Sequence, residues 1–162
     1  MTHAPASLSR PVAHVPGYIR LPGPIIRGLL RAGVPIGPNR LVTVRGRVSG
    51  EPRTQALAVI EIDGRRYVVG TFGDVNWCRN LRANPGVEMR LGGRRETLRA
   101  VELGTDQAAR FFRDVLVPGI PRMPLLTRIA SRALISGYAS DIVTDPEAAA
   151  TRRPVFELVR AS

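Results

Sequence analysis

The chain has 162 residues, a net charge of +11 at pH 7 and 44% apolar residues. This length suits one compact domain, because two domains made from it would each have a marginal core. No apolar run approaches the roughly 20 residues that a membrane-spanning helix needs, so the composition excludes a helical transmembrane protein and indicates a soluble one.

The positive charge comes from arginine alone, since all 24 basic residues are Arg and no acidic residue precedes Glu51. Arginine clusters bind nucleic-acid phosphates, but abundant Arg, Ala, Gly and Pro are also what a GC-rich genome produces. The chain shows neither interleaved aromatic residues nor a known nucleic-acid module, so we expect no nucleic-acid partner. The unopposed charge of the N-terminal third predicts instead an attraction to anions, or a peripheral contact with an anionic membrane.

Residues 1 to 22 are rich in Pro, Ser and Ala and lack apolar periodicity. They predict a flexible arm, followed by a single domain from 23 to 162. Prolines interrupt the stretch where a secretory signal would have its apolar core. The lone cysteine, Cys78, fits a reducing compartment, so we expect a cytoplasmic protein.

The first half of the domain reads as one helix and three strands. Apolar spacing from Pro24 to a stop at Gly33 predicts a short amphipathic helix, which we expect to dock on the domain rather than lie on a membrane. Leu41 to Arg45, Thr54 to Ile62 and Arg65 to Thr71 read as strands, with a tight turn at Asp63-Gly64. We expect these three strands to pair in succession.

The second half contains the remaining helices, one hairpin and a closing strand. Asp74 is the predicted cap of a helix that ends at Asn84-Pro85, where Asn would adopt the left-handed conformation. The later elements are predicted as strands Val87 to Leu91 and Arg94 to Leu103, a helix capped by Thr105 or Asp106 that runs to about Val117, a proline-broken helical stretch to Tyr138, and a strand Val155 to Val159. This order predicts an α+β protein that is mainly β, an antiparallel barrel with helices outside it.

The distribution of reactive residues excludes most catalytic chemistries. The histidines are His3 and His14, both in the predicted arm, and Cys78 stands alone. A histidine metal site, a catalytic triad and a histidine base in the core are therefore excluded, and we expect no metal. An enzyme with this composition would depend on a bound organic cofactor.

The segment Gly46 to Thr54 is the first candidate binding site. Arg47 and Arg53 flank a turn that contains Ser49 and Gly50, so two guanidinium groups, a hydroxyl and backbone N–H groups can converge on one oxyanion. Phosphate is the natural ligand. The alternative is an ordinary basic hairpin loop in an arginine-rich protein.

The segment Gly70 to Pro85 leaves a strand and opens a helix, whose first N–H groups could face an anion or a ring carbonyl. Trp77 could line a cofactor or belong to the core, and Asn80 could bind a ligand or link backbone segments.

Together these two segments resemble the deazaflavin-dependent nitroreductase family, in which a Gly-Arg-x-Ser/Thr-Gly-x-x-Arg turn precedes a Trp-x-x-Asn-Leu-x-x-Asn-Pro helix. The resemblance spans Leu41 to Leu103, and Arg153 to Leu158 is similar to the family's last strand. It implies a split β-barrel of the FMN-binding-like type. It also implies an enzyme that uses coenzyme F-420, a deazaflavin with a phosphate and an oligoglutamate tail, to pass hydride to a quinone, nitroaromatic or other electron-poor acceptor.

The resemblance also implies roles for particular residues. The phosphate would be held by Arg47, Ser49, Gly50 and Arg53. The deazaflavin ring would be lined by Thr54, Gln55, Ala56, Leu57, Gly70, Thr71 and Phe72, with Trp77 and Asn80 supporting that wall. Tyr138 falls where the family places pocket tyrosines and is the candidate catalytic proton donor, with simple packing as the alternative.

Four departures from the family pattern qualify these roles. Family members often have a basic residue at the position of Val48, a serine at that of Phe72 and an aromatic residue at that of Cys78. The loop from Phe72 to Trp77 is also several residues shorter than in the family. They predict weaker phosphate binding and altered substrate chemistry. A lipid or fatty-acyl binding protein on the same fold and an FMN-binding protein are therefore the alternatives, and a homodimer is expected because barrels of this type pair.

Overall fold

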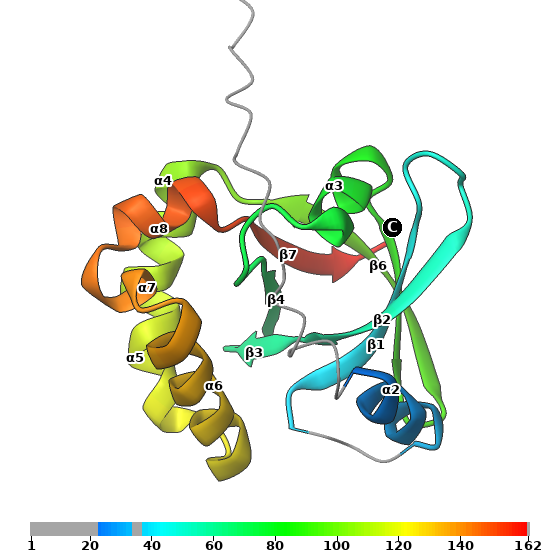
Figure 1. Ribbon diagram of the computed structural model, residues 1–162, viewed down its shortest axis with the longest axis horizontal. Helices are drawn as coiled ribbons and strands as arrows, with labels where there is room; N and C mark the ends of the chain where they lie inside the picture. The colour runs from blue at the N-terminus through cyan, green and yellow to red at the C-terminus, as the bar shows by residue number, and fades with distance from the viewer. Residues whose placement is uncertain (1–22, 34–36, 162) are drawn as a thin grey trace, which may run out of the picture.

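The structure is a computed structural model that describes residues 23–33 and 37–161. One antiparallel sheet of seven strands runs in the order β2-β1-β5-β6-β7-β4-β3 (Figure 1). The strands are β1 (Asn39–Arg45), β2 (Pro52–Ala58), β3 (Ile60–Ile62), β4 (Arg65–Val69), β5 (Gly86–Leu91), β6 (Arg94–Glu102) and β7 (Val155–Arg160). The predicted arm, residues 1 to 22, lies outside the described residues, and the division into arm and domain stays a prediction.

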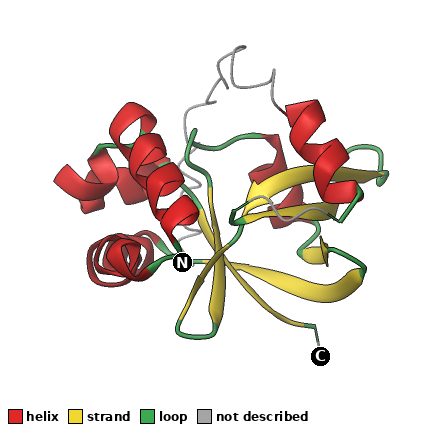
Figure 2. Ribbon diagram, turned by 90° about the horizontal axis from the view of Figure 1, so that it is seen from below, coloured by secondary structure: helices red, strands yellow, loops and turns green. Residues whose placement is uncertain are grey.

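The helices cover the sheet in two groups. They are α2 (Gly23–Arg31), α3 (Asn76–Ala83), α4 (Thr105–Arg110), α5 (Val117–Gly119), α6 (Leu125–Tyr138), α7 (Asp141–Thr144) and α8 (Pro146–Arg152), with a π-helical segment at Phe111–Leu116 and a 3-10 turn at Ile120–Arg122. Figure 2 shows the group from α4 to α8 gathered on one side of the sheet. The predicted fold, a split antiparallel barrel with peripheral helices, is confirmed.

The sheet curls into a half-barrel because its two edge strands follow one another in the chain. β2 is one edge and β3 the other, and only Val59 lies between them. The Val59 N–H donates to the carbonyl of Pro38 at 2.9 Å, and the side chain is buried. The chain itself therefore holds the two edge strands close together at Val59, and less of their backbone is open to pairing with another chain.

The prediction of one long strand from Thr54 to Ile62 was therefore wrong, because this stretch forms two strands, β2 and β3, at opposite edges of the sheet. The predicted succession of pairings is found, since β1 pairs with β2 and β3 pairs with β4, and β4 also pairs with β7. Residues 56 to 60 are all apolar, so the local sequence shows neither a polar residue nor a turn signal at the change of edge. The Asp63-Gly64 turn is confirmed, with φ of 51° and 73° at the two positions.

Side chains of β4 and β7 alternate between two cores. Val68 and Phe156 point into the barrel, where they pack with Trp77 and Leu81 of α3. The neighbouring side chains in both strands lie in a second core against the outer helices, with Tyr67, Phe111, Phe112, Ile142 and Val155 among its members. This alternation fixes the register of both strands, because a slip by one residue would exchange the two faces.

Three helix ends differ from the prediction. Asp74 does not cap α3, whose N-terminal cap is Val75 without a side-chain bond, because the Asp74 carboxylate pairs with Arg79 at 3.2 Å and Arg82 at 2.6 Å. Asn84 ends α3 in an extended conformation, with φ of −137°. Gly104 takes the place expected for Thr105 or Asp106 at the start of α4, where its N–H donates to the side chain of Gln107.

The helix predicted to run to Val117 widens into a π-helix from Phe111. The Val117 N–H donates to the carbonyl of Phe112, five residues back, directly before Pro118, which has no N–H to donate. Leu116, in this segment, is buried in the second core.

The amphipathic helix predicted from Pro24 to Gly33 is confirmed as α2, which contacts β1 and β2 and buries Leu30. This is the docked arrangement, and nothing in the described residues supports the membrane contact expected for the basic N-terminal third. None of the described helices is long and apolar enough to cross a bilayer.

Candidate active site

The turn between β1 and β2 has the closed shape that an anion site needs. The Gly46 N–H donates to the carbonyl of Glu51 at 2.8 Å, and the Gly50 N–H donates to the carbonyl of Gly46 at 2.9 Å. Gly50 has φ of 70°, which residues with a side chain rarely adopt. The Ser49 hydroxyl accepts from the Glu51 N–H at 3.3 Å, so its own proton is left for another partner.

Arg47 is held in place by the helix that follows the second motif. Asn80 Oδ1 accepts from Arg47 Nη1 at 3.0 Å and from the Arg47 backbone N–H at 3.2 Å. Asn76 Oδ1 accepts from Arg47 Nη2 at 3.4 Å. These bonds join residues 29 and 33 positions apart in the sequence, and they orient the guanidinium group without neutralising its charge.

Both arginines of the turn line one cavity of about 370 Å³, which we call the basic cavity. It is lined by Gly46, Arg47, Val48, Ser49, Arg53, Gln55, Asn76, Trp77 and Asn80, with no Asp or Glu among them. Among the described residues, Arg53 makes no side-chain hydrogen bond or ion pair. Its guanidinium group is therefore free to bind an anion that enters from solvent.

A second cavity, of about 430 Å³, lies between the sheet and the outer helices, and we call it the apolar cavity. Its sheet side contains Ala56, Leu57, Val68, Thr71, Phe72 and Trp77, and its helical side contains Leu116, Ser131, Leu134, Ile135 and Ile142. Trp77 lines both cavities, so the two lie next to one another at this residue. Phe72 forms part of the wall and leaves this volume open.

Most of the predicted site residues therefore come together around these two cavities. The exceptions have local structural tasks. The Thr54 hydroxyl lies 2.7 Å from that of Thr43 in the paired strand, Gly50 supplies the turn, and the Gly70 N–H donates to the Pro154 carbonyl at 2.7 Å. A side chain at Gly70 would meet Cys78 and Pro154, because its Cβ would lie 3.1 Å and 2.8 Å from them.

Tyr138 does not line the apolar cavity. It lies behind it, where its ring meets Phe72 edge-on with 5.6 Å between the centroids. Arg153 fixes this corner, because its guanidinium group donates to the carbonyls of Thr71 and Tyr138 and pairs with Asp141 at 2.8 Å. The end of α6 is thus tied to the loop that carries Thr71 and Phe72.

Cys78 contributes packing rather than reactivity. Its side chain is fully buried, and burial raises the pKa of its thiol to about 12. A neutral, inaccessible thiol is a poor nucleophile, so the cysteine has no part in the chemistry of either cavity.

Sequence reasoning missed Asn76 and the whole helical side of the apolar cavity. Asn76 stands in the first turn of α3, one turn before Asn80, and that spacing was the available signal. On α6 the inward positions Ser131, Leu134 and Ile135 follow helical spacing, but the pattern does not show which strand they face. That relation depends on the path of the chain from β6 to β7.

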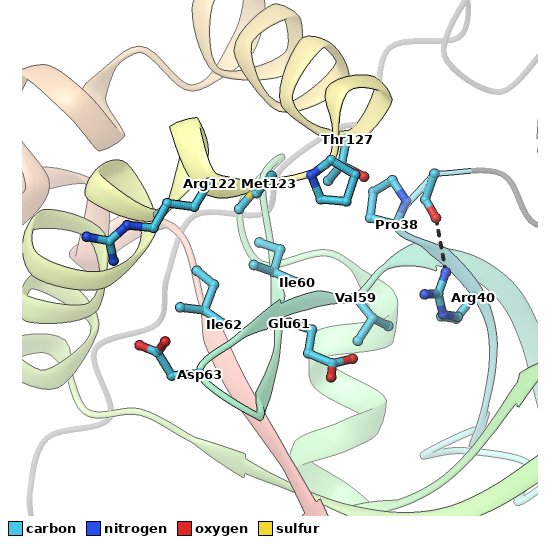
Figure 3. Close-up of a pocket in the computed structure, with 13 residues that line it drawn as sticks. Pro38, Arg40, Val59, Ile60, Glu61, Ile62, Asp63, Arg122, Met123 and Thr127 are labelled. Carbon is cyan, nitrogen blue, oxygen red and sulfur yellow. Dashed lines mark hydrogen bonds between the residues drawn. The ribbon is translucent and has the colours of Figure 1, made fainter.

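A third cavity, of about 490 Å³, lies between β3 and the segment that leads into α6 (Figure 3). It contains charges of both signs, with Arg40 and Glu61 on one side of Ile60 and Asp63 and Arg122 on the other. No residue predicted to bind the cofactor lines it. The mixture of charges fits a polyanion less well than the basic cavity does.

The chain is similar to a known protein family. A model of the family described as F420H(2)-dependent quinone reductase matches residues 24–119, more than half of the chain. A search of curated proteins found no match.

Among solved structures, a chain described as a domain-swapped dimer is 21% identical, with 87% of this chain and 96% of that chain covered and a TM-score of 0.47. An F420-H2 dependent reductase (FDR-A) is 22% identical, with 75% and 93% covered and a TM-score of 0.43. General Stress Protein 26 from Bacillus anthracis is 10% identical, with 82% and 87% covered and a TM-score of 0.46.

The family assignment rests on the family model, which includes both motifs and the strands between them. It confirms the deazaflavin-dependent family inferred from the sequence, under the name of a quinone reductase rather than a nitroreductase. The chain belongs to the F-420-dependent quinone reductase family, and it is an oxidoreductase whose cofactor is coenzyme F-420.

Proposed function

We propose that the protein passes hydride from reduced coenzyme F-420 to an apolar, electron-poor acceptor such as a quinone, a nitroaromatic compound or an enone. The observation that carries this proposal is the meeting of the basic and apolar cavities at Trp77. A molecule with a phosphate at one end and a flat ring at the other needs two such spaces side by side.

The residues of the basic cavity fit the anionic part of the cofactor. Arg53 offers its guanidinium group, Arg47 is oriented by Asn80, and Ser49 can donate its hydroxyl proton. The deazaflavin ring would lie against the sheet side of the apolar cavity, along Ala56, Leu57, Thr71 and Phe72, with Trp77 supporting it. When bound there, the coenzyme supplies the hydride.

The protein's own task is then alignment and exclusion of water. The helical side of the apolar cavity would hold the acceptor against the ring, because its hydrocarbon side chains replace water there. Tyr138 is the proposed source of the proton that completes the reduction, because its ring lies edge-on against Phe72 of the cavity wall. A cytoplasmic location and a homodimer also belong to this proposal.

The test is a titration of the purified protein with coenzyme F-420, in which the fluorescence of the coenzyme is measured. We expect saturable quenching that weakens as salt is added, because the cofactor's anionic groups meet arginines. Oxidation of the reduced coenzyme in the presence of a quinone should then be catalysed. Absence of quenching at low salt would refute the cofactor assignment for these cavities.

A lipid or fatty-acyl binding protein is the second candidate, and one observation favours it. The helical side of the apolar cavity is hydrocarbon apart from Ser131, and Val48 at the rim of the basic cavity is 92% exposed. Mass spectrometry of the native protein separates the candidates, since bound lipid without affinity for the coenzyme would favour the binder. A yellow preparation with flavin absorption would instead indicate FMN.

A further inference from the structure

The helical side of the apolar cavity carries one hydroxyl group, that of Ser131 on α6. The other four residues of this side, Leu116, Leu134, Ile135 and Ile142, have hydrocarbon side chains. On the remaining walls the side chains able to donate a hydrogen bond through N–H or O–H are Asn39, Thr71 and Trp77. The Thr71 hydroxyl already donates to the carbonyl of Val69 at 3.4 Å.

Ser131 has not committed its proton to a strong acceptor. Its hydroxyl donates to the sulfur of Met123 at 3.8 Å, and a thioether is a weak acceptor. Serine inside a helix commonly donates to the carbonyl four residues back, here Thr127, but the described residues show no such bond. An oxygen atom that enters the cavity would therefore be a better partner than the one Ser131 has.

We propose that Ser131 positions the acceptor by donating a hydrogen bond to one of its oxygen atoms, which selects apolar acceptors that carry a carbonyl or nitro oxygen. The inference rests on the proposed function, in which the cofactor ring covers the sheet side. The acceptor then occupies the space toward α6, where Ser131 is the only described hydroxyl on that side.

The hydrogen bond acts on the charge that the reaction creates. Hydride from the reduced coenzyme adds to the acceptor, the electron pair of its π bond moves to the oxygen, and negative charge develops there. The Ser131 hydroxyl stabilises that oxygen and keeps its own proton, while a separate donor completes the reduction. Ser131 is thus a positioning residue for the acceptor rather than the source of the transferred proton.

The helix offers a matched control for a test by mutation. Ser136 lies on the same helix, is exposed and lines neither the basic nor the apolar cavity, so Ser136→Ala makes the same chemical change away from the site. Ser131→Ala removes the hydroxyl, and Ser131→Thr retains it. The probe is menadione, a naphthoquinone without a long side chain.

Binding of menadione to the cofactor-free protein can be followed through Trp77, the single tryptophan of the chain and a wall residue of the cavity. We expect Ser131→Ala to weaken this binding roughly 5- to 20-fold, as the loss of one hydrogen bond does. In turnover the same variant should raise KM for menadione and lower kcat, while coenzyme affinity stays unchanged. Ser131→Thr should restore both values, and Ser136→Ala should leave them unaltered.

Equal menadione affinity in the wild type and in Ser131→Ala would overturn the inference, as would a failure of Ser131→Thr to restore what Ser131→Ala loses. This readout needs no cofactor, so it decides the role of Ser131 separately from the proposed function. A wild type that binds menadione but oxidises no reduced coenzyme with any acceptor would refute the proposed function alone.

Discussion

Asn80 holds Arg47 through one oxygen atom, which accepts from Nη1 at 3.0 Å and from the backbone N–H at 3.2 Å. The helix that carries Trp77 therefore also sets the direction of an arginine in the β1–β2 turn. Because the two contacts share one acceptor, a single substitution can remove both without changing the arginine's charge, and only the 3.4 Å bond to Asn76 then remains.

Asn80→Ala should weaken coenzyme F-420 binding roughly tenfold, since Arg47 then keeps only its bond to Asn76 and the ligand has to supply the rest of its ordering. Fluorescence titration at constant ionic strength measures the effect. Asn84→Ala is the control, because Asn84 follows the same helix and lines neither the basic nor the apolar cavity. An equal loss of affinity in both variants would show that helix stability, and not Arg47, is responsible.

Arg53→Ala should weaken coenzyme binding by about 1.5–3 kcal/mol, because a charged hydrogen bond to the phosphate is lost. The dependence of affinity on salt should also become shallower, as one cation fewer contacts the ligand. Arg99→Ala removes the same charge from an exposed position of β6 and should have little effect. If both variants bind the coenzyme as the wild type does, the phosphate does not lie at Arg53.

Tyr138→Phe keeps the ring that meets Phe72 and removes the hydroxyl. If Tyr138 is the proton donor, kcat should fall on the order of 100-fold while coenzyme affinity is unchanged. Steady-state kinetics across pH measures this, because loss of the donor also alters the pH profile of kcat. A variant with normal kcat would assign Tyr138 to packing against Phe72.

The buried thiol of Cys78 predicts a loss of stability at high pH. Burial raises the pKa of this thiol to about 12 in the folded protein, whereas the exposed thiol of the unfolded chain has a pKa of 9.0. As the pH rises, the unfolded chain therefore loses the thiol proton first. The stabilising contribution is complete below pH 9 and is lost as the pH rises toward 12, with about 1 kcal/mol lost by pH 10. Denaturant unfolding between pH 8 and 10 should show this decline in the wild type, and a smaller one in Cys78→Ala. Parallel curves would contradict it.

Gly70→Ala should destabilise the fold by about 1–3 kcal/mol, because the new Cβ would lie 2.7 Å from the Gly73 carbonyl and 2.8 Å from Pro154. Thermal unfolding measures the change. Gly86→Ala is the matched control, since a Cβ there meets nothing within 4 Å. Equal melting temperatures for the two variants would mean that the Gly70 loop can move aside.

Elements whose signals are local could be predicted from the amino-acid sequence. The α2 helix, the β1 strand and the Asp63-Gly64 turn follow from apolar period and from residues that accept positive φ. The two motifs also identified the turn and the helix that line the basic cavity. These features depend on neighbours within a few residues, so a linear pattern contains them.

Contacts between distant segments became known only from the folded structure. It placed the change of sheet edge at Val59, drew Asp74 away from the cap of α3 to two arginines, and brought Ser131 into the cavity while leaving Tyr138 behind Phe72. Each of these outcomes depends on packing and charge between segments far apart in the chain. The helix or strand propensity of a segment contributes less free energy than these packing and charge contacts do. The pattern of a single segment therefore does not reveal which distant residues it will contact.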